Sequence, residues 1–202
     1  MAHIYSFQGI RPVIDPSAYV HPAATIIGDV HIGPDVYIAP NASLRGDYGL
    51  IIVEAGANIQ DCCVMHGSAF GECRVEPDGH IGHGAILHTC RIARGALVGM
   101  NAVVMDNAVI GEEAFVAAMA FVRAGTQIPP RTLAAGIPAK VLRELSDADV
   151  AMKMEGTRQY QENARRAPLE LEPCEPLTEA EPNRGRISWE HDAKPLYGLK
   201  KT

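Results

Sequence analysis

A chain of 202 residues is long enough for one globular domain with a substantial core and an appendage. Its net charge of −6 argues against a large nucleic-acid or membrane-surface interface, because both need concentrated Lys and Arg. Only 5% of the residues are aromatic, and the 19 Gly and 14 Pro indicate many turns, which favours short strands over helices.

The amino terminus and the cysteines both bear on the cellular compartment. The first residues, MAHIYSFQGIRPV, contain neither a charged segment followed by an apolar core nor an apolar run that could span a bilayer. The five cysteines are an odd number with no framework spacing. We therefore expect a cytoplasmic protein whose thiols are reduced, with no membrane partner.

An aliphatic residue recurs at every sixth position through most of the first 130 residues. The series is Ile14, Val20, Ile26, Ile32, Ile38, Leu44, Val53, Ile59, Met65, Val75, Ile81, Leu87, Ile92, Val98, Val104, Ile110, Val116, Val122 and Ile128. A small residue, usually Ala, follows most of them by four positions. A period of six fits neither a helix nor a long alternating strand, but it suits a three-sided prism with one strand and one corner per hexad.

This pattern resembles the hexapeptide-repeat proteins, which form a left-handed parallel β-helix. We therefore predict an all-β fold of about six coils over residues 1–140. Ser146 and Asp149 have the spacing of a capping box, so a C-terminal α-helix, assigned to residues 141–167, is expected to pack on the prism. Prolines and glutamates then predict an extended tail over residues 168–202, lying on the surface or on a neighbouring subunit.

Hexads that are three steps apart share a face of the prism, so Arg45, His66 and His88 form a column on neighbouring coils. Two histidines one strand spacing apart can both bind one metal ion. His83 falls on the preceding face, stacked over Asp61, and cannot easily join them within one chain. We therefore predict a homotrimer in which His83 of the partner subunit completes a metal site between subunits.

Three neutral imidazoles leave one coordination position open for water, which is the catalytic pattern for zinc. The same ligands would accept Fe²⁺ or Co²⁺. The simpler alternative is that these histidines only occupy a polar flank of the β-helix, but three at matching phases favour a metal site. His80 is out of phase with the column and is expected either to support the site from outside the ligand set or to be structural.

The motifs RGDYG at 45–49, NIQD at 58–61, MHG at 65–67 and GHGAILH at 82–88 resemble the γ-class carbonic anhydrase-like family in order and spacing. The resemblance implies that His66 and His88 are zinc ligands from one subunit and His83 is a ligand from the next. It also implies an ion-pair cluster between subunits, formed by Arg45, Asp47 and Asp61. A purely structural role for Arg45 and Asp47 is the alternative.

The resemblance further implies catalytic roles. Gln60 would hydrogen-bond the metal-bound water, and Tyr160 would be the active-site tyrosine, although it could also be a packing residue of the helix. Tyr48 stands where the archetypal enzyme has a glutamate, and we include it among the catalytic candidates. The acidic proton-shuttle loop is replaced by SAFGEC, in which Glu72 is the only carboxylate, so we expect slow CO2 hydration.

Within this family, the segments SLRGDYG, GHIGHGAILH and RELSDADVAMKMEGTRQYQ resemble proteins encoded with phenylacetate degradation and, next, with carnitine metabolism. The resemblance implies a zinc-dependent acyl-CoA thioesterase of aromatic degradation, with metal-bound hydroxide as the nucleophile. A carbonic anhydrase with a weak proton shuttle is the alternative. A hexapeptide-repeat acyltransferase, suggested by GIPAK at 136–140, and a noncatalytic trimeric scaffold also stay open.

Overall fold

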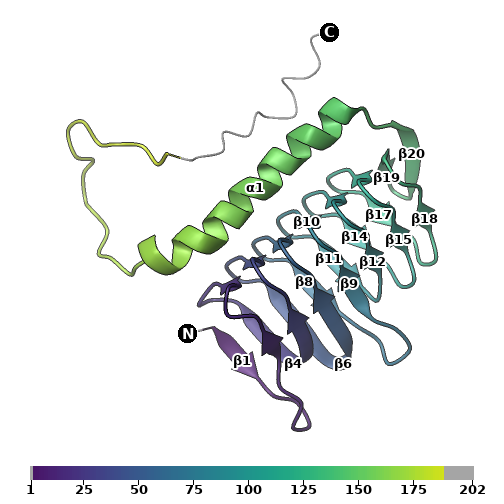
Figure 1. Ribbon diagram of the computed structural model, residues 1–202, viewed down its shortest axis with the longest axis horizontal. Coiled ribbons are helices and arrows are strands. Elements are labelled where there is room, and N and C mark those ends of the chain that lie inside the picture. Colours follow the sequence, from purple (N-terminus) through teal and green to yellow (C-terminus); the bar gives the residue numbers. More distant parts are fainter. Residues whose placement is uncertain (1, 189–202) are drawn as a thin grey trace.

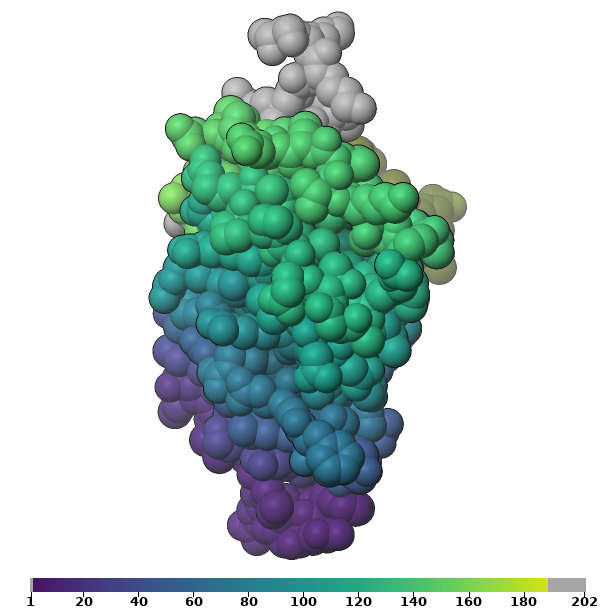
Figure 2. All heavy atoms as spheres, turned by 90° about the vertical axis from the view of Figure 1, so that its right-hand side faces the viewer, coloured from purple at the N-terminus to yellow at the C-terminus, as the bar shows by residue number. Residues whose placement is uncertain are grey.

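Short parallel strands form three flat faces that wind around one axis as a left-handed β-helix of about seven turns (Figure 1). This computed structural model describes residues 2–188. Figure 2 shows the sequence colours in bands, from purple at the amino-terminal end to green near the helix, because each coil stacks on the one before it. The predicted all-β left-handed parallel β-helix is therefore confirmed.

Each face contains one short strand from every coil. The first two faces belong to one sheet, because β4 (Thr25–Ile32) and β6 (Ser43–Val53) each contribute to both. The first face also contains β1 (His3–Tyr5), β8 (Val64–His66), β11 (Ile86–His88), β14 (Val103–Val104) and β17 (Phe121–Val122). The second contains β2 (Val13–Ile14), β9 (Cys73–Val75), β12 (Arg91–Ile92), β15 (Val109–Ile110) and β18 (Gln127–Ile128).

The third face is a separate sheet. It consists of β3 (Tyr19–Val20), β5 (Tyr37–Ile38), β7 (Asn58–Ile59), β10 (His80–Ile81), β13 (Leu97–Val98), β16 (Phe115–Val116), β19 (Thr132–Gly136) and β20 (Ala139–Glu144). All its neighbours pair in parallel except β19 and β20, which are antiparallel and end the stack.

The aliphatic series forms the core. Ile26, Leu44, Met65 and Leu87 pair in register on the first face, and all four side chains are fully buried. Parallel strands repeat at a spacing of about 4.8 Å, so equivalent hexad positions stack directly on one another. The turns number about seven rather than six, because β1 and β19 add strands outside the hexad series.

A left-handed backbone conformation closes many of the corners. Asn41, Asn101 and Asn107 have φ angles of 59°, 55° and 56°, and each precedes a fully buried alanine. Asn tolerates this region better than most residues, because its short polar side chain can hydrogen-bond locally. The alanine that follows leaves room for the chain to turn, which explains the small residue four positions after each aliphatic one.

Helix α1 spans Asp147–Glu170, so it begins at the capping box that the sequence predicted, within the segment 141–167 assigned to the helix. The first residues of that segment belong instead to β20, which extends the third face by pairing with β19. The helix ends later than expected because Pro168, assigned to the tail, lies in the last helical turn, where the missing N–H removes only one backbone hydrogen bond. The chain from 171 to 188 is irregular, and the rest of the predicted tail lies outside the described residues.

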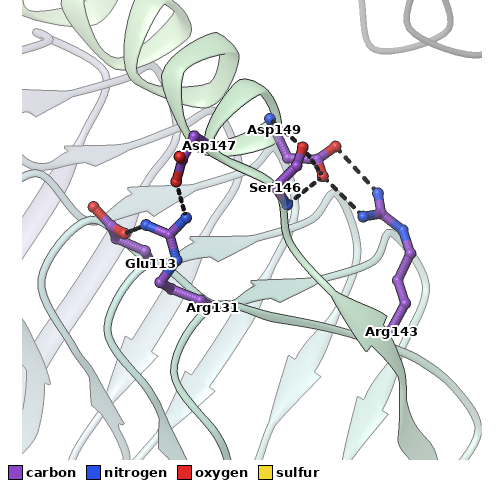
Figure 3. Close-up of polar contacts among 6 residues, drawn as sticks. All are labelled: Glu113, Arg131, Arg143, Ser146, Asp147 and Asp149. Atoms are coloured by element: carbon purple, nitrogen blue, oxygen red, sulfur yellow. Dashed lines mark hydrogen bonds and ion pairs between the residues drawn. The ribbon is translucent and has the colours of Figure 1, made fainter. Parts of the chain in front are cut away.

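The start of α1 is held to the last coils by charged side chains (Figure 3). Ser146 and Asp149 form the predicted capping box. Arg143 donates to both oxygens of Asp149, at 2.8 and 3.1 Å, and these bonds hold the pKa of that carboxyl below its ordinary value. Arg131 forms an ion pair with Glu113 at 2.8 Å and another with Asp147.

From this anchor, α1 runs back along the solenoid toward its first coils (Figure 1). Its Tyr160 ring packs 5.5 Å from that of Tyr37 on β5, measured between centroids.

The five cysteines, all within the described residues, are free thiols, as expected. No helix in residues 2–188 is long and apolar enough to cross a bilayer.

Candidate functional site

Arg45, His66 and His88 form the column that the repeat predicts. Arg45 on β6 pairs with His66 on β8, which in turn pairs with His88 on β11. Each follows a fully buried aliphatic residue, so the alternation of the strand turns all three side chains away from the core. The hexad count therefore placed these residues correctly relative to one another.

The two imidazoles of this column face each other. Nδ1 of His66 lies 3.2 Å from Nε2 of His88. The other nitrogen of each ring donates to a carboxylate, His66 Nε2 to Asp47 at 3.2 Å and His88 Nδ1 to Asp106 at 2.8 Å. A neutral imidazole has one N–H, so these bonds assign tautomers in which both facing nitrogens are acceptors. Two facing acceptors need a proton or a metal ion between them.

The distance between the facing nitrogens suits a shared metal ion. Zinc binds imidazole nitrogens at about 2.0–2.1 Å in a tetrahedral arrangement, which places two ligand nitrogens about 3.3 Å apart. Carboxylates on the outer nitrogens are the usual partners of metal-binding histidines. Within residues 2–188 of one chain, no group of three or more His, Cys, Asp or Glu side chains is arranged to hold a metal. His66 and His88 thus have the spacing of two metal ligands, without a third ligand beside them in the described part of the chain.

His83 lies at a different corner, directly after β10 on the third face. Its Nδ1 donates to Asp61 at 2.7 Å, which leaves Nε2 as an acceptor, and the two side chains are each 44% exposed. This contact agrees with the repeat count that stacks His83 over Asp61. His83 therefore has the same arrangement as the other two histidines, with one nitrogen bound to a carboxylate and the other available.

Asp47 links the histidine column to Arg45. Arg45 Nη1 lies 3.0 and 2.9 Å from the two carboxylate oxygens of Asp47. Desolvation raises the pKa of Asp47, but the hydrogen bond and charge of Arg45 and the bond from His66 outweigh it, and the pKa is lowered. Asp61, the third member of the predicted ion-pair cluster, contacts His83 within its own chain rather than this group.

Tyr48 lies against the same column. Its ring stacks on that of His66, with a centroid distance of 6.5 Å and an interplanar angle of 17°. The side chain is still exposed, so one face of the His66 ring is shielded by a residue that a substrate or a neighbouring subunit can reach.

Gln60 lies on the third face, in a buried polar network beneath α1. Its Nε2 donates to Asn58 Oδ1 at 3.0 Å and lies 2.7 Å from His80 Nε2. Nδ1 of His80 lies 3.2 Å from the Thr157 hydroxyl of α1. Burial, reinforced by the charge of Lys153, lowers the pKa of His80 to about 3. His80 is therefore a neutral structural residue.

Tyr160, the third catalytic candidate, belongs to the same network. Its ring lies edge-on to His80, with centroids 5.4 Å apart, and burial raises its pKa. Within one chain, Gln60 and Tyr160 therefore lie where α1 packs on the third face, apart from Tyr48, His66 and the rest of the column.

Two other residues of this region did not stand out in the sequence. Asp106, the hydrogen-bond partner of His88, lies two positions after Val104, on the coil that follows His88. Counting the repeat could therefore have placed it close to His88. Lys153 of α1 is buried and donates to the Asp78 carbonyl oxygen at 2.6 Å. Burial lowers its pKa to about 7. The hexad pattern describes only the β-helix, so it gave no indication of a buried lysine on α1.

Glu72, the single carboxylate of the loop after His66, is already paired. Arg74 Nε lies 2.5 Å from Glu72 Oε1, and Arg74 Nη2 lies 3.1 Å from Oε2. These bonds lower the pKa of Glu72, which keeps the side chain ionised and engaged. A carboxylate held in this way is poorly suited to relay protons.

This chain is similar in sequence to known proteins. Residues 13–141 match the family described as the GMPPB C-terminal domain. The carnitine operon protein CaiE of Proteus sp. (strain LE138) is 55% identical over 192 residues, which cover 95% of this chain and 98% of that protein. The CaiE of Salmonella typhimurium is 54% identical over 191 residues, covering 95% of this chain and 96% of that protein.

Two solved structures are also similar. A putative acetyltransferase from Bacillus cereus, the product of the BC4754 gene, superimposes with a TM-score of 0.80 at 40% identity, covering 81% of this chain and 95% of that one. A hexapeptide transferase family protein from Anaplasma phagocytophilum superimposes with a TM-score of 0.77 at 35% identity, covering 81% and 96%.

Proposed function

We propose that this chain, which belongs to the GMPPB C-terminal domain family and to the family of the carnitine operon protein CaiE, is a zinc-dependent hydrolase of acyl-CoA thioesters. The observation that carries the proposal is the pair of facing imidazole acceptors, His66 Nδ1 and His88 Nε2, each backed by a carboxylate. Together with His83 of the partner subunit, they would leave a fourth position open on zinc. Fe²⁺ or Co²⁺ fits the same ligands.

The proposed assembly is a homotrimer with one site at each interface. The His66 column and the His83 corner lie on different faces of one prism, so a head-to-tail ring would bring the column of each chain to the corner of the next. In such a ring, Asp61 of the partner subunit would also reach the Arg45 and Asp47 pair. This would complete the ion-pair cluster expected from the sequence.

In the proposed reaction, water is added across the thioester. A C–O bond forms at the carbonyl carbon, the C–S bond breaks, and the products are a carboxylate, the CoA thiol and a proton. When bound, zinc would supply Lewis acidity and lower the pKa of a water ligand. Asp47 and Asp106 orient the two imidazoles, and Tyr48 shields one face of His66. Gln60 and Tyr160 remain predicted catalytic residues.

The CoA substrate is inferred from chemistry and from the names of relatives. A site that hydrolyses a carbonyl compound can act on a thioester if the oxyanion is stabilised. The two CaiE relatives named above are carnitine operon proteins, which favours acyl thioesters of carnitine metabolism. The link to phenylacetate degradation and the cytoplasmic location stay predictions from the sequence.

Carbon dioxide hydration uses the same ligand set and is kept as a slow alternative. Fast hydration needs a relay that carries a proton from the metal to solvent. Because Glu72 is held by Arg74, we expect CO2 hydration far below that of an efficient anhydrase.

An acyltransferase is the second candidate, and the similarity to a putative acetyltransferase and to a hexapeptide transferase favours it. The two functions differ in the acyl acceptor. A hydrolase releases CoA from an acyl-CoA in buffer alone, whereas a transferase releases CoA only when an amine or hydroxyl acceptor is added.

The deciding experiment measures metal content by elemental analysis on anaerobically purified protein, followed by acyl-CoA hydrolysis on the same sample. We expect about one metal per chain and CoA release without an acceptor. Metal without hydrolysis would favour the anhydrase or a scaffold, and absence of metal would favour the acyltransferase. His83→Ala should lose metal while the trimer persists in sedimentation, which a purely adhesive metal would not allow.

A further inference from the structure

A cavity of about 680 Å³ lies between the third face and the start of α1. One wall is the outward row Leu97, Phe115 and Leu133, which pair in register on β13, β16 and β19. Ala148, in the first turn of α1, also lines it. The volume lies within the range of about 300–1,000 Å³ typical of small-ligand sites. The cavity is therefore large enough for a ligand and is built mainly from apolar side chains.

The corner beside this row carries small residues. Gly82, Gly99 and Ala117 line it at equivalent positions of successive coils. A Cβ on Gly82 would lie 2.9 Å from the backbone nitrogen of Met100, and one on Gly99 would lie 2.4 Å from that of Ala118. Coil stacking therefore requires glycine at both positions, which contribute only backbone to this wall of the cavity.

The polar groups of the cavity lie at its two ends. Arg143, Ser146 and Asp149 line the end at the start of α1, where Arg143 is neutralised by Asp149 (Figure 3). Gln60 and His80 line the other end, and both are neutral. The interior thus offers no unpaired charge to a ligand, and burying a charged group there would be unfavourable.

The end with Gln60 adjoins the corner that carries the proposed third ligand. Gln60 directly precedes Asp61, and Gly82 directly precedes His83, so both cavity residues are covalent neighbours of the Asp61 and His83 pair. A ligand in the cavity would therefore have its near end at this corner and its far end toward α1.

We infer that the cavity binds the acyl group of the substrate, and that this group is an uncharged hydrocarbon chain longer than acetyl. The thioester carbonyl would lie at the Gln60 and Gly82 end, with the CoA portion outside. That the bound group is part of a thioester rests on the proposed function. That it is an uncharged hydrocarbon chain rests on the apolar lining of the cavity alone.

The test uses two non-hydrolysable thioethers, S-ethyl-CoA and S-hexyl-CoA, titrated calorimetrically into the full-length assembled protein. Each buried methylene contributes about fourfold in affinity. With only part of the chain buried, S-hexyl-CoA should bind at least about tenfold more tightly than S-ethyl-CoA. Ala148→Phe should remove that preference by filling the cavity. Ala151→Phe, an exposed position of the same helix outside the lining, is the matched control.

Ala117→Phe fills the cavity from the β-helix instead of from α1. It therefore shows whether the result of Ala148→Phe comes from the filled cavity or from a disturbed start of α1. Loss of the hexyl preference in both filling variants, with S-ethyl-CoA binding kept and Ala151→Phe unchanged, supports the inference. Equal affinity of the two thioethers for the native protein overturns it, as does an equal loss of both in the filling variants.

Hydrolysis is measured separately, so that the two proposals can fail independently. Chain-length-dependent binding without hydrolysis of any acyl-CoA rejects the thioesterase and leaves the acyl site standing. Hydrolysis at rates and affinities that do not depend on acyl length rejects the acyl site and leaves the thioesterase standing.

Discussion

Asp106 accepts a hydrogen bond of 2.8 Å from Nδ1 of His88, from a position one coil further along the solenoid. His66 has the corresponding contact with Asp47 of the preceding coil. The two imidazoles therefore lie between two carboxylates, one on each side along the axis. This order directs the remaining nitrogen of each ring toward the other.

Asp106→Asn should weaken metal binding about 10- to 100-fold, because loss of the carboxylate removes the group that orients His88 and raises its basicity. The measurement is competition with a chelator of known affinity. Asp29→Asn is the control, since Asp29 lies 3.3 Å from His31 in a similar surface pair with a histidine outside the proposed ligand set. Unchanged metal affinity in Asp106→Asn would remove His88 from the proposed ligand set.

Mixed trimers test whether each site is shared between chains. His83→Ala subunits and His66→Ala/His88→Ala subunits should each bind little metal alone. After co-expression, random mixing should restore about one site in four, because each chain supplies the ligands that the other lacks. Metal analysis and acyl-CoA hydrolysis on the mixture provide the readouts. No recovery in trimers shown to contain both chains would contradict an intersubunit site.

His80 should make the protein less stable in mild acid. Its folded pKa of about 3 lies below the unfolded value of 6.5, so the unfolded chain binds more protons between these values and stability falls as the pH decreases. From pH 7 to pH 5 the loss should be about 2 kcal/mol in the free energy of unfolding. Denaturant titrations of His80→Asn should show a flatter pH dependence, and exposed His31→Asn should behave like the native protein.

Lys153 should make the stability of the protein depend on pH above neutrality. Its folded pKa of about 7 lies below the unfolded value of 10.5, so the unfolded chain binds more protons above pH 7 and stability rises with pH. Between pH 7 and pH 8.5 the gain should be about 2 kcal/mol. Lys153→Met should abolish this gain, whereas Lys140→Met, at an exposed position, should retain it. A gain that persists in Lys153→Met would show that another group titrates.

The extent of the repeat was readable from the sequence, but its ends were not. The hexad series identifies the inward residue of nearly every strand, because the same phase recurs in each coil. At the carboxy end, Ala139–Glu144 forms an antiparallel strand and α1 continues past Pro168, where local propensity and tertiary pairing compete. A capping box marked the start of α1 more reliably than the proline marked its end.

The candidate site was also only partly predictable from the sequence. Register follows from counting, so the sequence by itself determined that Arg45, His66 and His88 are neighbours and that His83 stacks over Asp61. Only the tertiary structure decided which carboxylates fix the imidazole tautomers, that Gln60 and Tyr160 meet where α1 packs on the third face, and that an apolar cavity lines up beside the corner that carries His83. The physical reason is that a repeat defines the phase of the backbone, whereas hydrogen-bond partners and empty space depend on side chains from several coils and the helix meeting at one place.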